Sequence, residues 1–452
     1  MKTPILVAVV AALITAAALP QPASAQASPP PFYSIINVNP AGTPAALAHG
    51  VNDDYQVVGN YIAGSVARAF LWMPGVPSFP FDSSPATYAI AINDLGQIAG
   101  DGYNATDGRA ANATIWSPAS YLGTTYTKTV DLAGVGTDGS DFTAIDDNGD
   151  AVGFLSSSNT GGNALEWEGG SLTGPTDYFP YAMNTDLGNS AGYQAGAAWA
   201  LNLDNGIAPT ALPGGLFGGI TYTSGSSSAT GIDEADDVIG DDNNQTARTI
   251  QPFAWDGVTG KAYGPLGNLP RASYGYATAI NTITGDVVGQ SGYHAFLWQG
   301  DITNPSGGTM TDLNSLVESN SGWSLREATG QNDYGAIVGY GYYQQKEAAF
   351  LAIPVILSSL TTDSPTAVGG TTIAGTITLD APAPFDMDVT VTTYSAKVNF
   401  GAGIYTTGLM IHSGDTSARF VANSSSVTVD TPVTLKATFG GWRRYAKVDL
   451  LP

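Results

Sequence analysis

The sequence of 452 residues contains no cysteine. Disulfides, thiol nucleophiles and cysteine metal ligands are therefore excluded. An exported chain without disulfides depends on buried apolar surface for its stability, and a chain of this length can bury enough to fold. Histidine is almost as scarce, because the chain has only three, at His49, His294 and His412.

Positive charge is the second deficit. Lys and Arg together number 15 against 38 Asp and Glu, which gives a net charge of −23. An acidic surface repels phosphate backbones and anionic headgroups, so nucleic acid and anionic membranes are disfavoured as partners. Charged residues make up only 12% of the chain, whereas glycine is frequent, with 56 residues. This composition favours strands and turns over helices.

Long apolar runs are missing except at the start of the chain. Ile5 to Ala18 is apolar or small apart from Thr15, and it is followed by prolines and by Ala23-Ser24-Ala25. This pattern predicts a secretory signal peptide over residues 1–25, cleaved after Ala25. No later run reaches the length of a membrane span. We therefore expect a secreted protein, extracellular or at the cell surface, and we expect no anchor at the C-terminus.

One phrase recurs seven times along the chain. In its second copy it reads Ala91-Ile-Asn-Asp-Leu-Gly-Gln-Ile-Ala-Gly100. Each copy has an Asn or Asp anchor, and the mean period is about 47 residues, as in repeat architectures. The anchors are Asn52, Asn93, Asp146, Asn184, Asp233, Asn281 and Asn332.

A second phrase trails each anchor and ends in an aromatic pair, as in His294-Ala-Phe-Leu-Trp298. Six of the eight tryptophans of the chain occupy this one slot. They are Trp72, Trp116, Trp167, Trp199, Trp255 and Trp298.

The first phrase has the chemistry of a β-hairpin. Apolar strand residues flank an Asn-Asp-x-Gly turn, in which Asn and Asp bond their own backbone and Gly adopts positive φ. The closing Gly indicates a bulge or a close backbone approach. The second phrase is a third strand, and segments such as Thr129 to Leu132 and Thr309 to Leu313 add a looser fourth.

A unit this small cannot bury its own face, so neighbouring units must stack. Four short strands per repeat, seven times over, predict a seven-bladed β-propeller across residues 26–353. Tyr33 to Val38 resembles the fourth strand but precedes the first copy, so we expect it to complete the last blade. A solenoid or an array of stacked sandwiches is the alternative.

These paired phrases carry a family resemblance. His294-Ala-Phe-Leu-Trp298, with Ala279-Ile-Asn and Val287-Val-Gly upstream, resembles the HAF-repeat family of bacterial extracellular proteins. The resemblance covers about residues 33 to 352 and implies an extracellular protein with a propeller, without implying an activity. Copy four departs most from the pattern, so we expect an irregular blade there.

The composition of the sequence changes near Pro354, where Thr, Ser and Val begin to alternate. Residues 354–452 are expected to form about seven strands, which is typical of an immunoglobulin-like β-sandwich without its disulfide. The run from Ser364 to Gly370 and the turn at Gly414 resemble bacterial immunoglobulin-like repeats. A spacer role is the simplest reading of such a domain.

Candidate catalytic residues are few. The three histidines fall in different units, which disfavours a zinc site or a Ser-His-Asp triad. Ser190 lies in a Gly-x-Ser-x-Gly motif, yet a nucleophile elbow needs a strand-to-helix turn and this motif lies in the fourth hairpin. We therefore predict no catalytic, cofactor-binding or metal-binding residue.

Calcium is the one ion to weigh. The loops from Asp146 to Asp150 and from Asp233 to Asp237 gather oxygen ligands, as hard cations require. Neither loop matches the EF-hand pattern. Turn chemistry explains these acids more simply, and a calcium site at one of the loops is the alternative.

Aromatic clusters at Tyr340 to Tyr343 and Tyr274 to Tyr276 suit either strand packing, which we favour, or stacking on sugars. We expect a non-enzymatic interaction, adhesion or surface-structure module with an unknown protein or polysaccharide partner. The alternatives are a carbohydrate-active propeller enzyme, either hydrolase or lyase, and a calcium-dependent carbohydrate-binding protein.

Overall fold

The computed structural model describes residues 32–452 except for residues 44, 83, 85–86, 104–110, 133–138, 156–162, 169–170, 174–178, 185–188, 195–196, 203–206, 212–215, 218–219, 222–225, 245–248, 260, 319–320, 381, 384–385, 402, 413 and 440–441. The expected signal peptide, residues 1–25, lies outside this range. Within it the protein is all-β, and its two helical elements are the short 3-10 turns η1 (Pro305–Gly307) and η2 (Leu313–Leu316).

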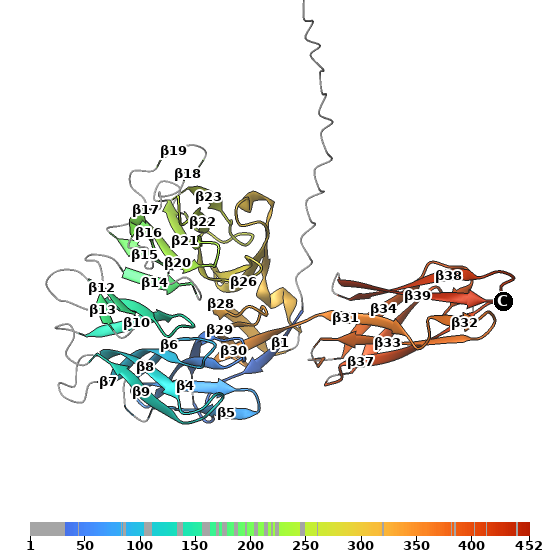
Figure 1. Ribbon diagram of the computed structural model, residues 1–452, viewed down its shortest axis with the longest axis horizontal. Coiled ribbons are helices and arrows are strands. Elements are labelled where there is room, and N and C mark those ends of the chain that lie inside the picture. The colour runs from blue at the N-terminus through green and yellow to red at the C-terminus, as the bar shows by residue number, and fades with distance from the viewer. Residues whose placement is uncertain are drawn as a thin grey trace, which may run out of the picture.

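The repeat region forms seven antiparallel sheets of four strands each (Figure 1). Sheet 1 contains β2 (Ala46–Val51), β3 (Val57–Ala63), β4 (Val66–Met73) and β5 (Val76–Phe79), and sheet 2 contains β6 (Tyr88–Ile92), β7 (Ile98–Tyr103), β8 (Ala111–Pro118) and β9 (Tyr126–Asp131). Sheet 3 contains β10 (Ser140–Ile145), β11 (Ala151–Leu155), β12 (Asn163–Glu168) and β13 (Ser171–Thr173), and sheet 4 contains β14 (Phe179–Met183), β15 (Asn189–Gln194), β16 (Ala197–Asn202) and β17 (Ile207–Ala211).

The later sheets follow the same order. Sheet 5 contains β20 (Ser226–Ile232), β21 (Asp237–Asn244), β22 (Thr249–Asp256) and β23 (Ala262–Pro265), and sheet 6 contains β24 (Gly275–Ile280), β25 (Val287–Ser291), β26 (His294–Gln299) and β27 (Thr309–Asp312). Sheet 7 contains β28 (Trp323–Gln331), β29 (Ile337–Tyr343), β30 (Lys346–Val355) and β1 (Phe32–Asn37). Sheet 4 keeps the common order despite its divergent sequence, and a small hairpin of β18 (Leu216–Phe217) and β19 (Ile220–Thr221), which the sequence did not predict, follows it.

The N-terminal strand completes the last sheet, as the sequence predicts. β1 pairs antiparallel with β30, from Phe32 opposite Val355 to Asn37 opposite Phe350. Asn39 Oδ1 also accepts a hydrogen bond from Ala349 N at 2.8 Å. Strands from the two ends of the repeat region therefore share one sheet.

The turn chemistry predicted for the repeat is confirmed at its anchors. In the first copy Asn52 Oδ1 accepts a hydrogen bond from Gln56 N at 2.9 Å, and Tyr55 N donates to Asn52 O at 3.0 Å. The anchor side chain thus closes the turn that joins the first two strands of its sheet. The turn after Asn281 is longer by one residue, so Asn281 Oδ1 accepts from Ile283 N and Thr284 N instead.

A bulge in the first strand of each sheet explains the closing glycine. All seven sheets show it opposite that glycine, and in sheet 6 it lies between Ala277 and Ala279. A Cβ added to Gly289 would lie 2.0 Å from Tyr276 O. The neighbouring backbone therefore occupies the space of any side chain at this position.

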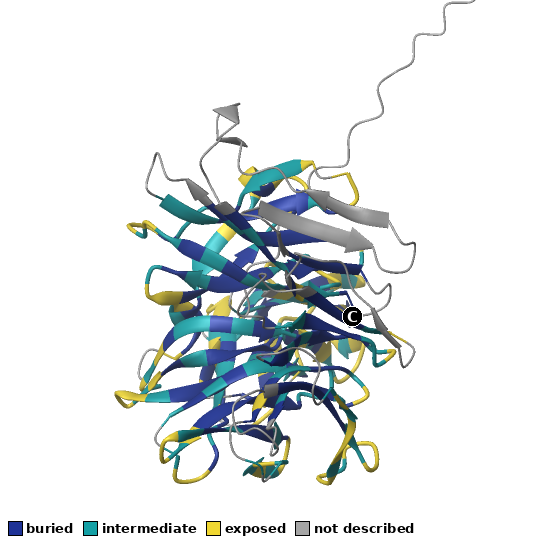
Figure 2. Cartoon of the chain, turned by 90° about the vertical axis from the view of Figure 1, so that its left-hand side faces the viewer, coloured by how far each residue is buried: buried dark blue, intermediate teal, exposed yellow. Residues whose placement is uncertain are grey.

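The hydrophobic cores lie between neighbouring sheets (Figure 2). Phe296 and Trp298 of sheet 6, for example, are fully buried against Ile239 and Ala254 of sheet 5. The core between sheets 7 and 1 joins Phe70 to Leu351 in the same way. The repeated aromatic strand therefore fills the contact between adjacent sheets.

Residues beyond Pro354 form two further sheets around a core of their own. One contains β31 (Leu357–Thr362), β33 (Thr372–Leu379), β37 (Ser417–Ser424) and β35 (Val398–Asn399), and the other contains β32 (Thr366–Val368), β39 (Trp442–Leu451), β38 (Thr431–Phe439), β34 (Met387–Thr393) and β36 (Thr406–Ile411). This part has nine strands among its described residues, where the sequence predicted about seven. β32 and β35 are three and two residues long, too short to show an alternating pattern.

Candidate binding site

The three histidines are placed apart. His49 lies on β2 and His294 on β26, where its Nδ1 is 2.5 Å from Asp312 Oδ2. His412 follows β36, and its Nδ1 is 3.3 Å from Asp386 Oδ1. The described residues therefore bring no two histidines into one site.

Ser190 lies within β15, opposite Met183 on one side and Leu201 on the other. Its side chain is fully buried, and the strand continues beyond it to Gln194. A nucleophile elbow requires an exposed hydroxyl on a turn from a strand into a helix. The geometry around Ser190 lacks that turn.

The two acidic loops use their carboxylates to close turns. Asp146 Oδ1 accepts hydrogen bonds from Asn148 N at 2.9 Å and from Asp150 N at 2.8 Å. Asp233 Oδ1 accepts the equivalent pair from Ala235 N and Asp237 N, and burial raises the pKa of Asp233 to about 6. Among the residues that the structure places, no group of three or more His, Asp or Glu could hold a metal ion.

The anchors have a second role that the sequence analysis missed. Asn52 Nδ2 donates to Asn93 O at 2.9 Å, and Asn93 Nδ2 donates to Asp146 O at 2.7 Å. Asn332 Nδ2 donates to Asn52 O at 3.0 Å. Each of these amides therefore joins its own sheet to the next one. Asp146 and Asp233 lack an amide and cannot donate this bond.

The residue after the anchor adds a parallel set of links. Asp53 N donates to Asp94 Oδ1 and Asp94 N donates to Asp147 Oδ1, both at 2.8 Å, while Asp333 N donates to Asp53 Oδ1 at 3.0 Å. Burial, together with the negative charge of Asp94, raises the pKa of Asp53 to about 6. These carboxylates are acceptors for the neighbouring backbone.

Threonine at the bulge makes a third set of links. Thr143, Thr230 and Thr278 donate their hydroxyls to Pro180 O, Ala277 O and Ala328 O in the next sheet, at 2.7–2.8 Å. Thr329 donates to Ala48 O of sheet 1 at 2.8 Å. A threonine three residues before the anchor in four of the seven copies was the sequence signal for this contact.

Taken together, these bonds connect every sheet to its neighbour and sheet 7 to sheet 1. The step from sheet 4 to sheet 5 is made by Asn189 Nδ2, which donates to Asp236 Oδ1 at 2.6 Å. The repeated polar residues are thus used to join sheets.

Titratable groups also occur within the strands, away from the turns that hold the anchors. Asp101 lies in β7, Asp141 in β10 and Asp241 in β21. Burial and a hydrogen bond with Asp141 raise the pKa of Asp101 well above its usual range. Burial raises the pKa of Asp241 to about 7. Sugar hydrolysis needs two carboxyl groups about 5 to 10 Å apart with the substrate between them. Asp101 and Asp141 instead bond to each other.

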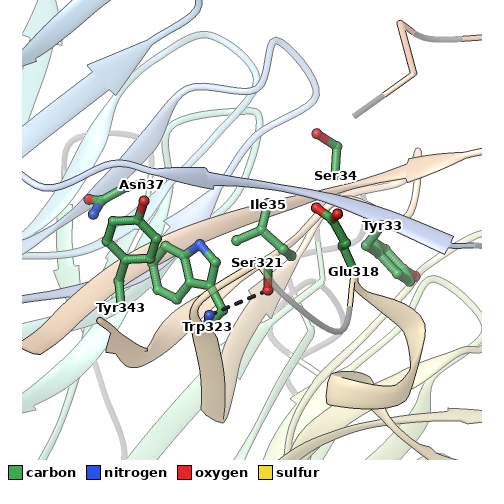
Figure 3. Close-up of a pocket in the computed structure, with 8 residues that line it drawn as sticks. All are labelled: Tyr33, Ser34, Ile35, Asn37, Glu318, Ser321, Trp323 and Tyr343. Carbon is green, nitrogen blue, oxygen red and sulfur yellow. Dashed lines mark hydrogen bonds between the residues drawn. The ribbon is translucent and has the colours of Figure 1, made fainter. Parts of the chain in front are cut away.

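A pocket of about 250 Å³ lies between sheet 7 and the segment that follows β27 (Figure 3). β1 supplies one wall, and the first residue of β28 and the last of β29 supply another. The lining residues are Tyr33, Ser34, Ile35, Asn37, Glu318, Ser321, Trp323 and Tyr343. Trp323 is one of two tryptophans outside the repeat slot, which was the sequence signal for a different role.

The aromatic rings in this pocket are held in place. The Trp323 and Tyr343 ring centroids are 5.0 Å apart with 35° between the planes, and Trp323 meets Phe350 edge-on at 6.2 Å. Ser321 Oγ accepts a hydrogen bond from Trp323 N at 3.3 Å. The half-buried indole therefore presents a fixed surface to the pocket.

The tyrosine clusters predicted from the sequence meet across sheets 6 and 7. Tyr274 contacts Tyr276 and Tyr293, with centroids 6.1 and 5.9 Å away. The Arg326 guanidinium carbon lies 5.9 Å from the Tyr293 ring centroid and 5.2 Å from that of Tyr342. This part of the surface is packed and also exposes rings, since Tyr293 is 68% exposed.

Comparisons with known proteins add little. No protein-family model and no curated protein matches the chain. It is similar to the solved structure "Structural basis for Dscam isoform specificity" at 9% identity and a TM-score of 0.17, over 93% of this chain and 99% of that one. It is similar to the FN1-FN3 domains of chicken CNTN1 at 7% identity and a TM-score of 0.14, over 94% and 100%. In the described residues, no helix is long and apolar enough to cross a membrane.

Proposed function

We propose that this chain is a secreted, non-enzymatic interaction protein with a seven-bladed β-propeller over residues 26–353 and an immunoglobulin-like domain over residues 354–452. The seven four-stranded sheets, bonded each to the next and the last to the first, support the propeller. In such a propeller an N-terminal strand can close the ring by completing the last blade, and the pairing of β1 with β30 fits this arrangement.

The observation that carries a binding role is that the repeated polar residues and the pocket residues are different sets. The repeated Asn, Asp and Thr side chains are engaged in turns and in links between sheets. The mixed aromatic and polar pocket, by contrast, is formed by residues outside the repeated phrases, including Trp323 and Glu318. Ligand sites are concave, largely apolar and oriented by a few polar groups, and this pocket has that character.

The resemblance to HAF repeats and the signal-peptide pattern support an extracellular location. The C-terminal pair of sheets has its own core and few partners in the ring, which suits a spacer that holds the propeller away from a surface. The partner in this proposal is a polysaccharide or protein outside the cell.

The test is a binding and turnover assay on the mature chain. Residues 26–452 are purified and exposed to an array of polysaccharides and to extracellular protein extracts, and soluble products are analysed by mass spectrometry. The expected result is saturable binding with no product. Product formation that scales with protein concentration would overturn the non-enzymatic assignment, and absence of any binding partner would overturn the interaction role.

A further inference from the structure

The pocket against β1 contains three polar groups that can form further hydrogen bonds. Asn37 Oδ1 accepts a hydrogen bond from Asn39 N at 3.0 Å, which orients the side-chain amide and leaves Nδ2 as a donor. Among the residues that the structure describes, none bonds Asn37 Nδ2, the Glu318 carboxylate or Trp323 Nε1. The pocket therefore offers two donors and one anionic acceptor to a ligand.

These groups surround a rigid aromatic surface. Trp323 and Tyr343 lie at one end of the pocket beside Asn37, and Glu318 lies toward the other end with Ser34 (Figure 3). A pyranose ring has an apolar face of C–H groups, which packs on aromatic rings, and equatorial hydroxyls around its edge. Such a ring would place its face on Trp323 and its hydroxyls toward Asn37 and Glu318.

The volume of the pocket and the charge of the protein restrict the class of ligand further. The pocket volume of about 250 Å³ lies just below the range of about 300–1,000 Å³ for sites that hold drug-sized ligands, so it suits one sugar ring. The net charge of −23 and the Glu318 carboxylate repel sugar acids. The chemistry therefore favours a neutral sugar.

We propose that this pocket binds one neutral hexopyranose unit of an extracellular polysaccharide, with Trp323 as the stacking surface and Asn37 and Glu318 as hydroxyl partners. This inference rests on the interaction function proposed above and names its ligand class. The pocket is shaped by β1, so the strand that closes the ring also forms a wall of the site.

The experiment titrates the mature chain with methyl glycosides of glucose, galactose and mannose and with their neutral oligosaccharides, followed by tryptophan fluorescence and by calorimetry. The expected result is saturable binding of at least one sugar. E318A and N37A alter exposed side chains, and W323A removes the stacking ring. Each should weaken binding by about tenfold or more, which corresponds to one decade in Kd.

Two matched variants separate recognition from folding. W323F keeps an aromatic ring and should bind within about threefold of the unmodified chain, less than one decade. Y334A removes a tyrosine that is 62% exposed at the opposite end of sheet 7, and it should leave binding unchanged. Thermal unfolding of all variants checks that W323A is folded.

The outcomes are distinct. If no neutral sugar binds while a protein partner does, the pocket inference fails and the interaction role stands. If sugar binds equally to E318A, N37A and W323A, the sugar site lies elsewhere and the inference fails. Product release from the oligosaccharides would overturn the non-enzymatic proposal.

Discussion

Six closing glycines occupy positions where a side chain would collide with the neighbouring strand. The sequence predicted a close approach there, and the structure supplies the reason, because each glycine lies opposite a bulge. The bulge residue itself differs between sheets, being threonine in four and His49 in sheet 1. The repeat pattern of the sequence identified the glycine. The hydrogen bond that threonine donates to the next sheet could not be predicted in this way, because it depends on where that sheet lies.

Replacing Gly289 by alanine is expected to destabilise the protein by about 2–3 kcal/mol, as overpacking in a rigid site does. The added Cβ would lie 2.0 Å from Tyr276 O, and only backbone movement can relieve that contact. Urea unfolding followed by fluorescence measures the change. Gly307→Ala is the control, because its Cβ meets no atom nearer than 3.9 Å and should cost less than about 0.5 kcal/mol. Equal stability of the two variants would contradict the prediction.

His49 should make the protein sensitive to mild acid. Asn60 Oδ1 accepts a hydrogen bond from Ala89 N, so Asn60 Nδ2 faces His49 Nε2 at 3.1 Å and requires a neutral ring. Burial lowers the pKa of His49 to about 4, below its ordinary 6.5. Stability from this group is present above pH 6.5 and is lost as the pH falls toward 4, because the unfolded chain binds the proton first.

The test compares unfolding free energies at pH 7.5 and pH 5.0. His49→Gln should reduce the loss on acidification by about 2 kcal/mol relative to the unmodified chain. His412→Gln, at a side chain that is 69% exposed, should leave the loss unchanged. Because both variants retain every carboxylate, acid effects of those groups cancel in the comparison. If His49→Gln and the unmodified chain lose the same free energy, the neutral histidine has no part in acid sensitivity.

At the scale of strands and turns, the repeat was predictable and its irregular parts were not. Alternation, turn residues and the aromatic slot located the hairpins and the third strands. The pocket was missed because its residues come from β1, from the start of β28, from the end of β29 and from the segment before β28. No sequence period relates these positions. Only the placement of Trp323 outside the common slot distinguished it.

Removing β1 is expected to open sheet 7. A chain that begins at residue 38 loses buried Tyr33 and exposes the edge of β30, so the loss of stability should exceed about 3–5 kcal/mol, the usual cost of deleting one large core side chain. Thermal unfolding and light scattering would show a lower transition temperature and self-association through the free edge.

A chain that begins at residue 32 is the control and should match the mature protein. A synthetic peptide of residues 32–38, added to the shortened chain, should restore part of the lost stability by adding the missing strand, whereas a scrambled peptide should not. A monomeric shortened chain with an unchanged transition temperature would show that β1 does not close the sheet.

At the scale of the whole molecule, two bodies are joined by a nearly continuous strand. β30 ends at Val355 and β31 begins at Leu357 (Figure 1). The aromatic rings of Phe32 and Phe439 contact each other, with centroids 5.5 Å apart, and so connect β1 to β38. The C-terminal sheets have a separate core that includes Val389, Phe420 and Leu435. The change in composition near Pro354 is the basis on which the sequence predicts a domain boundary there.

Residues 355–452 are therefore expected to fold alone. The isolated fragment should give dispersed NMR spectra and one cooperative unfolding transition, because its core is complete without the repeat region. Calorimetry of residues 26–452 should show the same transition within about 2–4 °C, a shift that corresponds to roughly 1 kcal/mol of contact with the repeat region. An unfolded fragment would contradict the predicted boundary and would indicate that the repeat region supports these sheets.

The pairing of β1 with β30 has a consequence for how the chain is made. Asn37 emerges from the ribosome more than three hundred residues before its partner Phe350, and Ala349 bonds Asn39 across a separation of 310 residues. Contacts this distant in sequence form slowly, since a long loop must close first. β1 therefore stays unpaired until β30 has been synthesised, and until then it is an unprotected edge that a chaperone or a neighbouring nascent chain can capture.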